Sequence, residues 1–310
     1  MSDIVNVLND AKRMKILEDK DFDEAIKIAL DINTKRQMAE FCNKAGLNAH
    51  TYGANAFQTL DELGGMEEVK KQLEENIIDV WDPEVRKIFK ENKIDLPGGV
   101  MLEGPPGTGK TTIIETLARQ MDVPLYKMDY SKMHDSSFIH AIARNVSEIF
   151  EKLKLQSKII KKPVMLFFDE AEKFFPRTAR EKHELEEVNT YKELMNTASE
   201  NGIILTGATN HIDMVNQEIV GNPRRMGTVI HVDNPDEEGR KNLFEKLRDN
   251  KPILASVLTA GVIAELVALS DGLSIGKITD TLNKLVSQSI RHKQGVNEQA
   301  VIDAFKKVIK

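Results

Sequence analysis

The chain has 310 residues, of which 41% are hydrophobic and 30% charged, so it is long enough for one large and one small globular domain. A net charge of −6 gives no electrostatic reason for non-specific nucleic-acid binding, and one cysteine excludes an intrachain disulfide or a cysteine-based metal site. The N-terminal sequence lacks the basic and apolar parts of a signal peptide, and no apolar run approaches the roughly 20 residues that cross a bilayer, so we expect a cytoplasmic protein without membrane contact.

Residues 1–58 are expected to form a short helical N-terminal extension and a linker. Asp21 and Glu24 resemble a helix N-cap, apolar residues then recur at helical spacing, and Gly46 is a candidate stop. Residues 47–60 lack a clear period and read as a linker. The pattern leaves two roles open, a helical cap or oligomerisation arm and a partner-binding module.

Residues 59–234 alternate β-prone runs with helical segments, which predicts an α/β core with a parallel five-stranded sheet flanked by helices. The run Val164–Phe168 is continuously apolar, as expected for a strand buried on both faces. The five expected strands are Gly99–Leu102, Leu125–Met128, Val164–Phe168, Ile203–Thr206 and Thr228–Val232.

Residues 235–310 contain no strand pattern and are expected to form a small all-helical lid domain. Asp236 is a candidate cap for a helix that carries Leu243, Phe244 and Leu247 at helical spacing. Further helices are expected at about 253–269, 275–292 and 297–309.

A phosphate-binding loop follows the first strand of the core. Gly104, Gly109, Lys110 and Thr111 match the spacing G-x-x-x-x-G-K-[ST], with a strand before the loop and a helix after it. Glycines let backbone N–H groups close around phosphates, and the helix N-terminus favours the negative charge. Lys110 is expected to reach the β- and γ-phosphates of ATP, and Thr111 to offer a hydroxyl to Mg²⁺. The predicted nucleotide contacts in this segment are Pro106, Gly107, Thr108, Gly109, Lys110, Thr111 and Thr112.

Two acids follow the apolar run Val164–Phe168. Asp169, at the strand end, is expected to hold Mg²⁺ through water, and Glu170 to polarise the attacking water as general base. Such a pair is common at strand ends, but its place about 60 residues after the phosphate loop predicts ATP hydrolysis.

With these two motifs and a helical lid, the sequence resembles the AAA family of ATPases from about Leu60 to its C-terminus. The segment Asp61–Lys70, which contains Gly64, resembles the part of the family that lies against the adenine. Asn210 ends the run that resembles sensor 1, which implies that it orients the attacking water. Gly276 lies where the family carries a glycine-rich sensor 2 segment and could approach the nucleotide. The neighbouring Lys277 leaves two roles open, a contact with phosphate and a solvated lysine, of which the second is favoured.

The resemblance also implies an arginine finger, supplied to a neighbouring subunit. Counting back from Pro235, Arg225 matches the first finger position and Thr228 departs from the second, where Arg224 is a candidate substitute. A finger stabilises charge on the transferring phosphoryl group. The alternative is a solvated basic turn.

Phe138 and Ile139 match the aromatic and aliphatic positions that face the central pore in the family, while His140 replaces the glycine. An exposed Phe is costly unless it contacts something. The alternative is that Phe138 is a core residue of a helix over 136–150.

The resemblance therefore implies a homo-hexameric ATPase that remodels or threads a protein substrate. One alternative is an ATP-dependent assembly switch or scaffold without threading. A nucleic-acid-linked ATPase is the third, against which the acidic charge and the 5% aromatic content argue.

Overall fold

The structure, a computed structural model, describes residues 57–64, 66–134, 141–178, 181–292 and 295–308, together with 38, 40–42, 45 and 47–49. The helix expected to begin near Asp21, its stop at Gly46, and the Phe138–Ile139 segment lie outside the described residues. Within the described part, no helix combines the length and apolar character needed to span a membrane.

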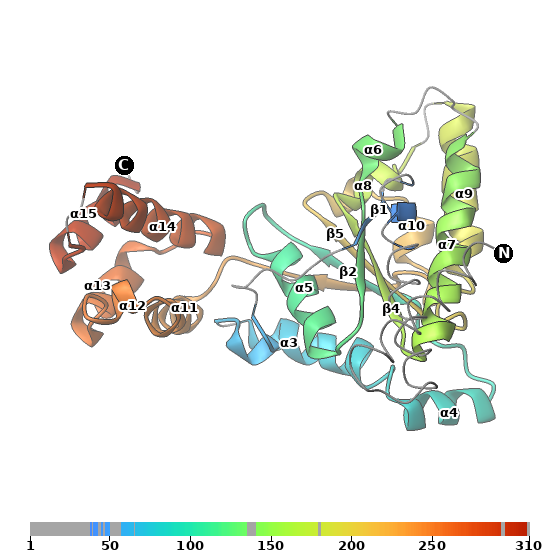
Figure 1. Cartoon of the computed structure of the whole chain (residues 1–310), viewed down its shortest axis with the longest axis horizontal. Coiled ribbons are helices and arrows are strands. Elements are labelled where there is room, and N and C mark those ends of the chain that lie inside the picture. The colour runs from blue at the N-terminus through green and yellow to red at the C-terminus, as the bar shows by residue number, and fades with distance from the viewer. Residues whose placement is uncertain are drawn as a thin grey trace, which may run out of the picture.

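In the described part of the chain, six strands form one sheet in the order β1-β3-β4-β5-β2-β6. Helices surround this sheet (Figure 1). All neighbours are parallel except β1 and β3, which are antiparallel. The strands are β1 (Leu47–Ala49), β2 (Gly99–Glu103), β3 (Leu125–Met128), β4 (Val164–Asp169), β5 (Ile203–Thr209) and β6 (Thr228–His231). The predicted parallel five-stranded α/β sheet is therefore confirmed, with one short edge strand added.

That edge strand corrects the prediction of a linker over residues 47–60. Leu47 pairs with Met128 and Ala49 with Tyr126, and the Leu47 side chain is buried against the sheet. Three residues are too few to show the alternation of apolar and polar side chains that identifies a strand. This strand therefore forms because it pairs with β3, and its own sequence does not predict it.

Successive side chains of the central strands face opposite sides, and each side is covered by helices. On β4, Met165 and Phe167 pack in the apolar cluster that includes α5 (Lys110–Gln120). Leu166 and Phe168 pack in the cluster that includes α7 (Ala141–Ile160) and α9 (Lys182–Met195). The helical segments of this part are η1 (Leu60–Glu62), α3 (Glu67–Leu73), the π-helix η2 (Glu74–Ile78), α4 (Pro83–Glu91), α5 (Lys110–Gln120), α6 (Tyr130–His134), α7 (Ala141–Ile160), α8 (Ala171–Phe174), α9 (Lys182–Met195), η3 (Ile212–Met214) and α10 (Gln217–Val220).

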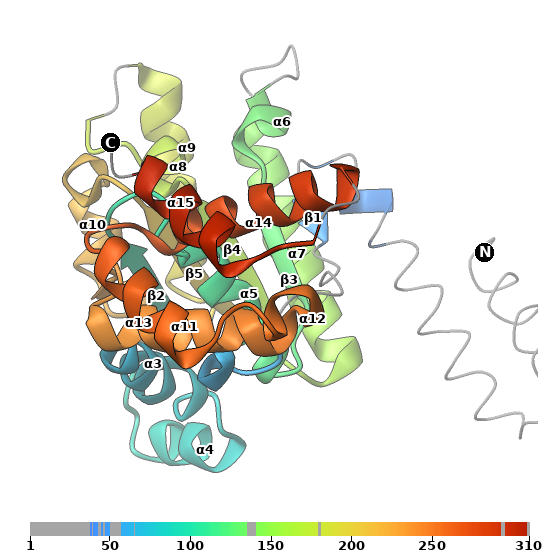
Figure 2. The ribbon, with the colours of Figure 1, turned by 90° about the vertical axis from the view of Figure 1, so that its left-hand side faces the viewer.

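The five C-terminal helices share an apolar cluster of their own and form a group at one end of the sheet (Figures 1 and 2). Asp236 caps the first of them, because its carboxylate accepts a 2.7 Å hydrogen bond from Gly239 N. These helices are α11 (Glu237–Asn250), α12 (Pro252–Ala255), α13 (Ala260–Leu269), α14 (Ile275–His292) and α15 (Glu298–Val308).

The single helix expected over 253–269 is wrong, since two helices occupy this segment. The apolar residues Val257 and Leu258 extend the helical pattern across the break and are buried without being helical. Thr259 then starts α13, because its hydroxyl accepts a hydrogen bond from Val262 N.

Candidate active site

The candidate site lies at the carboxyl ends of three adjacent parallel strands. β2 leads into the loop Gly104–Thr111, β4 ends at Asp169, and Asn210 directly follows β5. Because β5 lies between β2 and β4, the three segments reach the same edge of the sheet. Ligands of open parallel sheets bind at this edge.

The loop delivers the first turn of α5 to this edge. Gly109 has a φ of 93°, a left-handed conformation that favours glycine, and α5 begins at the next residue, Lys110. The first N–H groups of a helix have no partner within it, so this turn can bind an anion. Thr108 is fully buried and its hydroxyl donates to Pro105 O at 3.0 Å, which fixes the shape of the loop.

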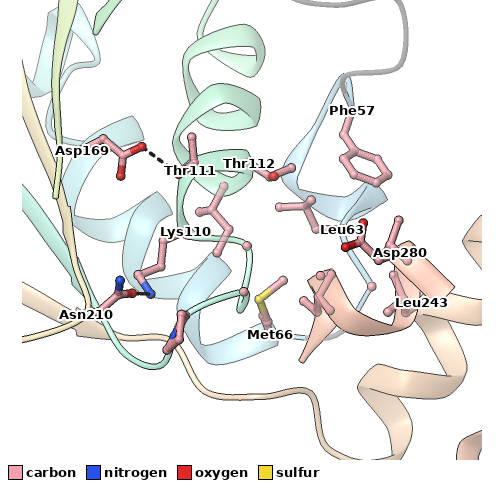
Figure 3. A pocket seen from close by; sticks show the side chains of 18 of the residues that line it. Phe57, Leu63, Met66, Lys110, Thr111, Thr112, Asp169, Asn210, Leu243 and Asp280 are labelled. Carbon is pink, nitrogen blue, oxygen red and sulfur yellow. Dashed lines mark hydrogen bonds between the residues drawn. The ribbon is translucent and has the colours of Figure 1, made fainter. Parts of the chain in front are cut away.

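The Lys110 ammonium is held by oxygen atoms from two strand ends. It donates hydrogen bonds of 2.8 Å to Gly104 O and to Pro105 O. A third bond, also of 2.8 Å, goes to the side-chain oxygen of Asn210 (Figure 3). Burial lowers the pKa of Lys110, and the nearby Asp169 opposes this shift. The site therefore holds a buried cation whose present acceptors are neutral oxygens, which anionic phosphate oxygens could replace.

Asp169 and Thr111 together supply oxygen atoms of the kind that Mg²⁺ prefers. Thr111 Oγ1 donates to Asp169 Oδ2 at 3.3 Å, across the space between α5 and β4 (Figure 3). A hydroxyl and a carboxylate are hard ligands, and few protein ligands suffice for Mg²⁺ because it keeps several waters. These residues therefore fit the metal. The described residues contain no group of three or more His, Cys, Asp and Glu side chains that could hold another metal ion.

Glu170 has a φ of 55°, in the left-handed region that costs a non-glycine residue on the order of 1–3 kcal/mol. It directly precedes α8, and its carboxylate forms an ion pair with Lys173 one turn later. Backbone strain of this kind clusters at functional sites.

One cavity of about 540 Å³ joins these groups, a size suited to a nucleotide. The predicted residues that line it are Gly64, Pro106, Gly107, Gly109, Lys110, Thr111, Thr112, Asp169, Glu170, Asn210 and Gly276. Of the predicted nucleotide contacts, only Thr108 is absent from the lining. The structure thus brings together residues separated by more than 200 positions.

The end of the cavity away from Lys110 has mostly apolar walls, which come from the sheet-containing part of the chain and from the C-terminal helices. The remaining lining residues are Phe57, Leu63, Met66, Ile113, Leu243, Leu247, Ile275, Thr279 and Asp280. Figure 3 shows Phe57, Leu63, Leu243 and Asp280 grouped on this side. Leu63 and Met66 belong to the segment Asp61–Lys70 that was expected beside the adenine, but none of these residues was named individually as a site residue. Leu243 and Leu247 were recognised only as apolar helix positions, and Asp280 carried no signal.

The lid touches the phosphate loop directly. Gly276 N, in the first turn of α14, donates a 2.8 Å hydrogen bond to Gly107 O. A Cβ on Gly276 would lie 3.2 Å from that oxygen, so any side chain here would force the loop or α14 to shift by a few tenths of an ångström. Lys277 does not line the cavity.

The two arginines before β6 lie outside the cavity. The Arg225 guanidinium is buried and donates to Asn196 Oδ1 at 2.9 Å and to Glu218 O at 2.7 Å. Arg224 is exposed and pairs with Asp95 at 2.6 Å. A finger must reach a neighbouring subunit, and in this arrangement Arg225 is bound within its own chain.

Residues 100–234 match the model of the family described as "ATPase family associated with various cellular activities (AAA)". The match begins in β2 and ends after β6. It therefore covers the phosphate loop, Asp169, Glu170, Asn210 and both arginines.

Similar proteins align over most of the chain. They include the ATP-dependent zinc metalloprotease FtsH 2 of Sphaerobacter thermophilus (25% identical, 81% of this chain and 37% of the relative). The cell division cycle protein 48 homolog of Archaeoglobus fulgidus is 26% identical over 80% of this chain and 33% of the relative. Proteasome-activating nucleotidase 1 of Haloferax volcanii is 28% identical over 81% of this chain and 60% of the relative. The chain thus spans only about a third of the first two relatives.

Proposed function

We propose that this chain, which belongs to the AAA family of ATPases, uses ATP hydrolysis to remodel a protein substrate. The observation that carries the proposal is the single cavity in which the phosphate loop, the two acids after β4, Asn210 and the lid glycine Gly276 meet. Nothing else in the described residues combines a phosphate-binding loop with two carboxylates. We take residues 59–234 as the ATPase core and 235–310 as its lid.

Each group has a role that its position supports. Lys110 binds the β- and γ-phosphates, which requires it to release the neutral oxygens it now holds. Asn210 is then free to orient the attacking water, and Glu170 takes the proton of that water. Thr111 and Asp169 hold Mg²⁺. When bound, the metal supplies charge neutralisation on the phosphate oxygens.

Contact between Gly276 and Gly107 supports coupling of the lid to the nucleotide. A nucleotide that fills the cavity touches both the loop and α14, so its binding and release change the position of the lid. Movement of the lid relative to the core is the proposed source of mechanical work.

A protein substrate is supported by the names of the relatives, two of which are a metalloprotease and a proteasome-activating nucleotidase. We propose a homo-hexameric ring, with Phe138 and Ile139 facing its pore. Arg225 completes a neighbour's site only if its guanidinium leaves Asn196 and Glu218. Cytoplasmic location stays a prediction, as do the two alternatives of an assembly switch and a nucleic-acid-linked ATPase.

The test measures ATP turnover of the full chain with an unfolded protein such as casein, and separately with single-stranded DNA. Stimulation by casein but not by DNA is expected. In Phe138→Ala, basal turnover should persist while casein stimulation and unfolding activity disappear. Stimulation by DNA alone would contradict the proposal and support the nucleic-acid alternative. An unchanged response to casein in Phe138→Ala would refute the proposed contact between Phe138 and the substrate in the pore.

A further inference from the structure

The carboxylate assigned to the metal is shared with a lysine from the neighbouring strand. Lys127 Nζ, on β3, lies 2.6 Å from Asp169 Oδ2, the same oxygen that accepts from Thr111 at 3.3 Å. Both side chains of the pair are mostly shielded, with 32% of Lys127 and 26% of Asp169 exposed. The ion pair is therefore part of the site and not a surface contact.

Strand register places this lysine at the metal site. Lys127 is the direct partner of Phe167 in the parallel pair of β3 and β4, and Asp169 is two residues further along the same face of β4. The ammonium also lies 5.6 Å from the centre of the Phe167 ring, which favours a cation above it. Two independent contacts thus hold the charge beside Asp169.

A lysine ammonium and a hydrated Mg²⁺ make the same demand on a carboxylate oxygen. Lysine is a compact charge that donates only, and the waters of Mg²⁺ also act as donors to Asp169. The Lys127 ammonium and the hydrated metal therefore compete for Asp169 Oδ2. The two positive charges also repel each other when both lie beside the same carboxylate.

We propose that Lys127 occupies Asp169 while the metal is absent, so that Mg²⁺ must displace it and the nucleotide site needs more Mg²⁺ than it would without this lysine. The proposal rests on the proposed function, because it assumes that Thr111 and Asp169 hold Mg²⁺ beside a nucleotide. Lys127 is thus a positioning residue that balances the charge of the Asp169 carboxylate and holds it in place between nucleotide cycles.

The other lysine near the acids differs in ways that make it a useful comparison. Lys173 pairs with Glu170 within one turn, and both side chains are about half exposed, 48% and 55%. It contacts the proposed base and not the metal ligand. Its removal should therefore leave the Mg²⁺ requirement for binding unchanged.

The test is a MgCl₂ titration, starting in EDTA, of the binding of fluorescent N-methylanthraniloyl-ADP to the full chain. In Lys127→Met the Mg²⁺ concentration for half-maximal binding should fall about two- to fivefold, the range for one partly shielded ion pair. Lys127→Arg, which keeps the charge, should stay close to wild type. Lys162→Met, which removes an exposed lysine paired with Asp122, is the matched control and should not change the titration.

An unchanged or higher Mg²⁺ requirement in Lys127→Met would overturn the inference. If that variant does not fold, Lys127→Gln keeps a donor without the charge and carries the same expectation. A second readout is thermal unfolding without nucleotide, where Lys127→Met should melt below wild type in EDTA and recover with Mg²⁺. Failure of wild type to bind the analogue at any Mg²⁺ concentration would instead refute the proposed function.

Discussion

Replacing Gly276 by valine should weaken nucleotide binding about tenfold. A Cβ at this position would lie 3.2 Å from Gly107 O and 3.4 Å from Gly107 Cα, and the branches of valine extend the contact further. The phosphate loop or α14 must therefore move, which stretches the 2.8 Å hydrogen bond between them. A lost hydrogen bond of about 1 kcal/mol with a few tenths of a kcal/mol of strain gives roughly 1.4 kcal/mol, or a factor of ten.

Fluorescent ADP titration measures this effect, and the chain offers a matched control. Gly261 occupies the second position of α13, as Gly276 does in α14, but a Cβ there would meet nothing within 4 Å. Gly261→Val should bind nucleotide as wild type does. Equal affinity in Gly276→Val and wild type would refute the claim that contact between lid and loop shapes the site.

Two further predictions concern buried charges. Arg225→Ala should lower the free energy of unfolding by roughly 2–3 kcal/mol in urea denaturation, because Asn196 and the Glu218 carbonyl lose a buried cationic donor. Arg224→Ala should change it little, and equal effects of the two variants would contradict the placement of Arg225. Burial raises the pKa of Glu187 to about 7, above the usual 4.5, so the folded state holds this proton more tightly. The contribution of Glu187 to stability should thus be greatest at low pH and decrease by on the order of 3 kcal/mol as the pH rises from 4.5 through 7. Glu187→Gln should remove this decrease in denaturation curves at pH 5 and 8, and a wild type that gains stability relative to Glu187→Gln over this interval would contradict the sign.

Local sequence was sufficient for the parts of the site that follow strand ends. The loop Gly104–Thr111 has a fixed spacing between a strand and a helix, and Asp169 ends a short apolar run that is typical of a strand buried on both faces. Parallel strands bring their carboxyl ends to one edge, so the meeting of these segments with Asn210 follows from topology. Gly276 was placed by resemblance, and its contact with the loop supports that placement.

Side-chain contacts between elements that are distant in the sequence could not be predicted from local sequence patterns. Lys127 is an ordinary lysine in a short strand, and its contact with Asp169 depends on the register of β3 against β4. The direction of Arg225 is set by Asn196 and Glu218, which the local turn does not reveal. Asp280 lines the cavity only because α14, which carries it, packs against one end of that cavity.

The most direct test of the account is phosphate release by the full chain and by Glu170→Gln, with ATP binding measured in the same samples. Wild type should hydrolyse ATP in a Mg²⁺-dependent manner. Glu170→Gln should bind ATP within about twofold of wild type and release phosphate about 10²–10⁴-fold more slowly, since only the group that takes the proton of water is lost. Normal turnover in Glu170→Gln, or a wild type that binds no ATP, would contradict the assignment of this cavity as the site of hydrolysis.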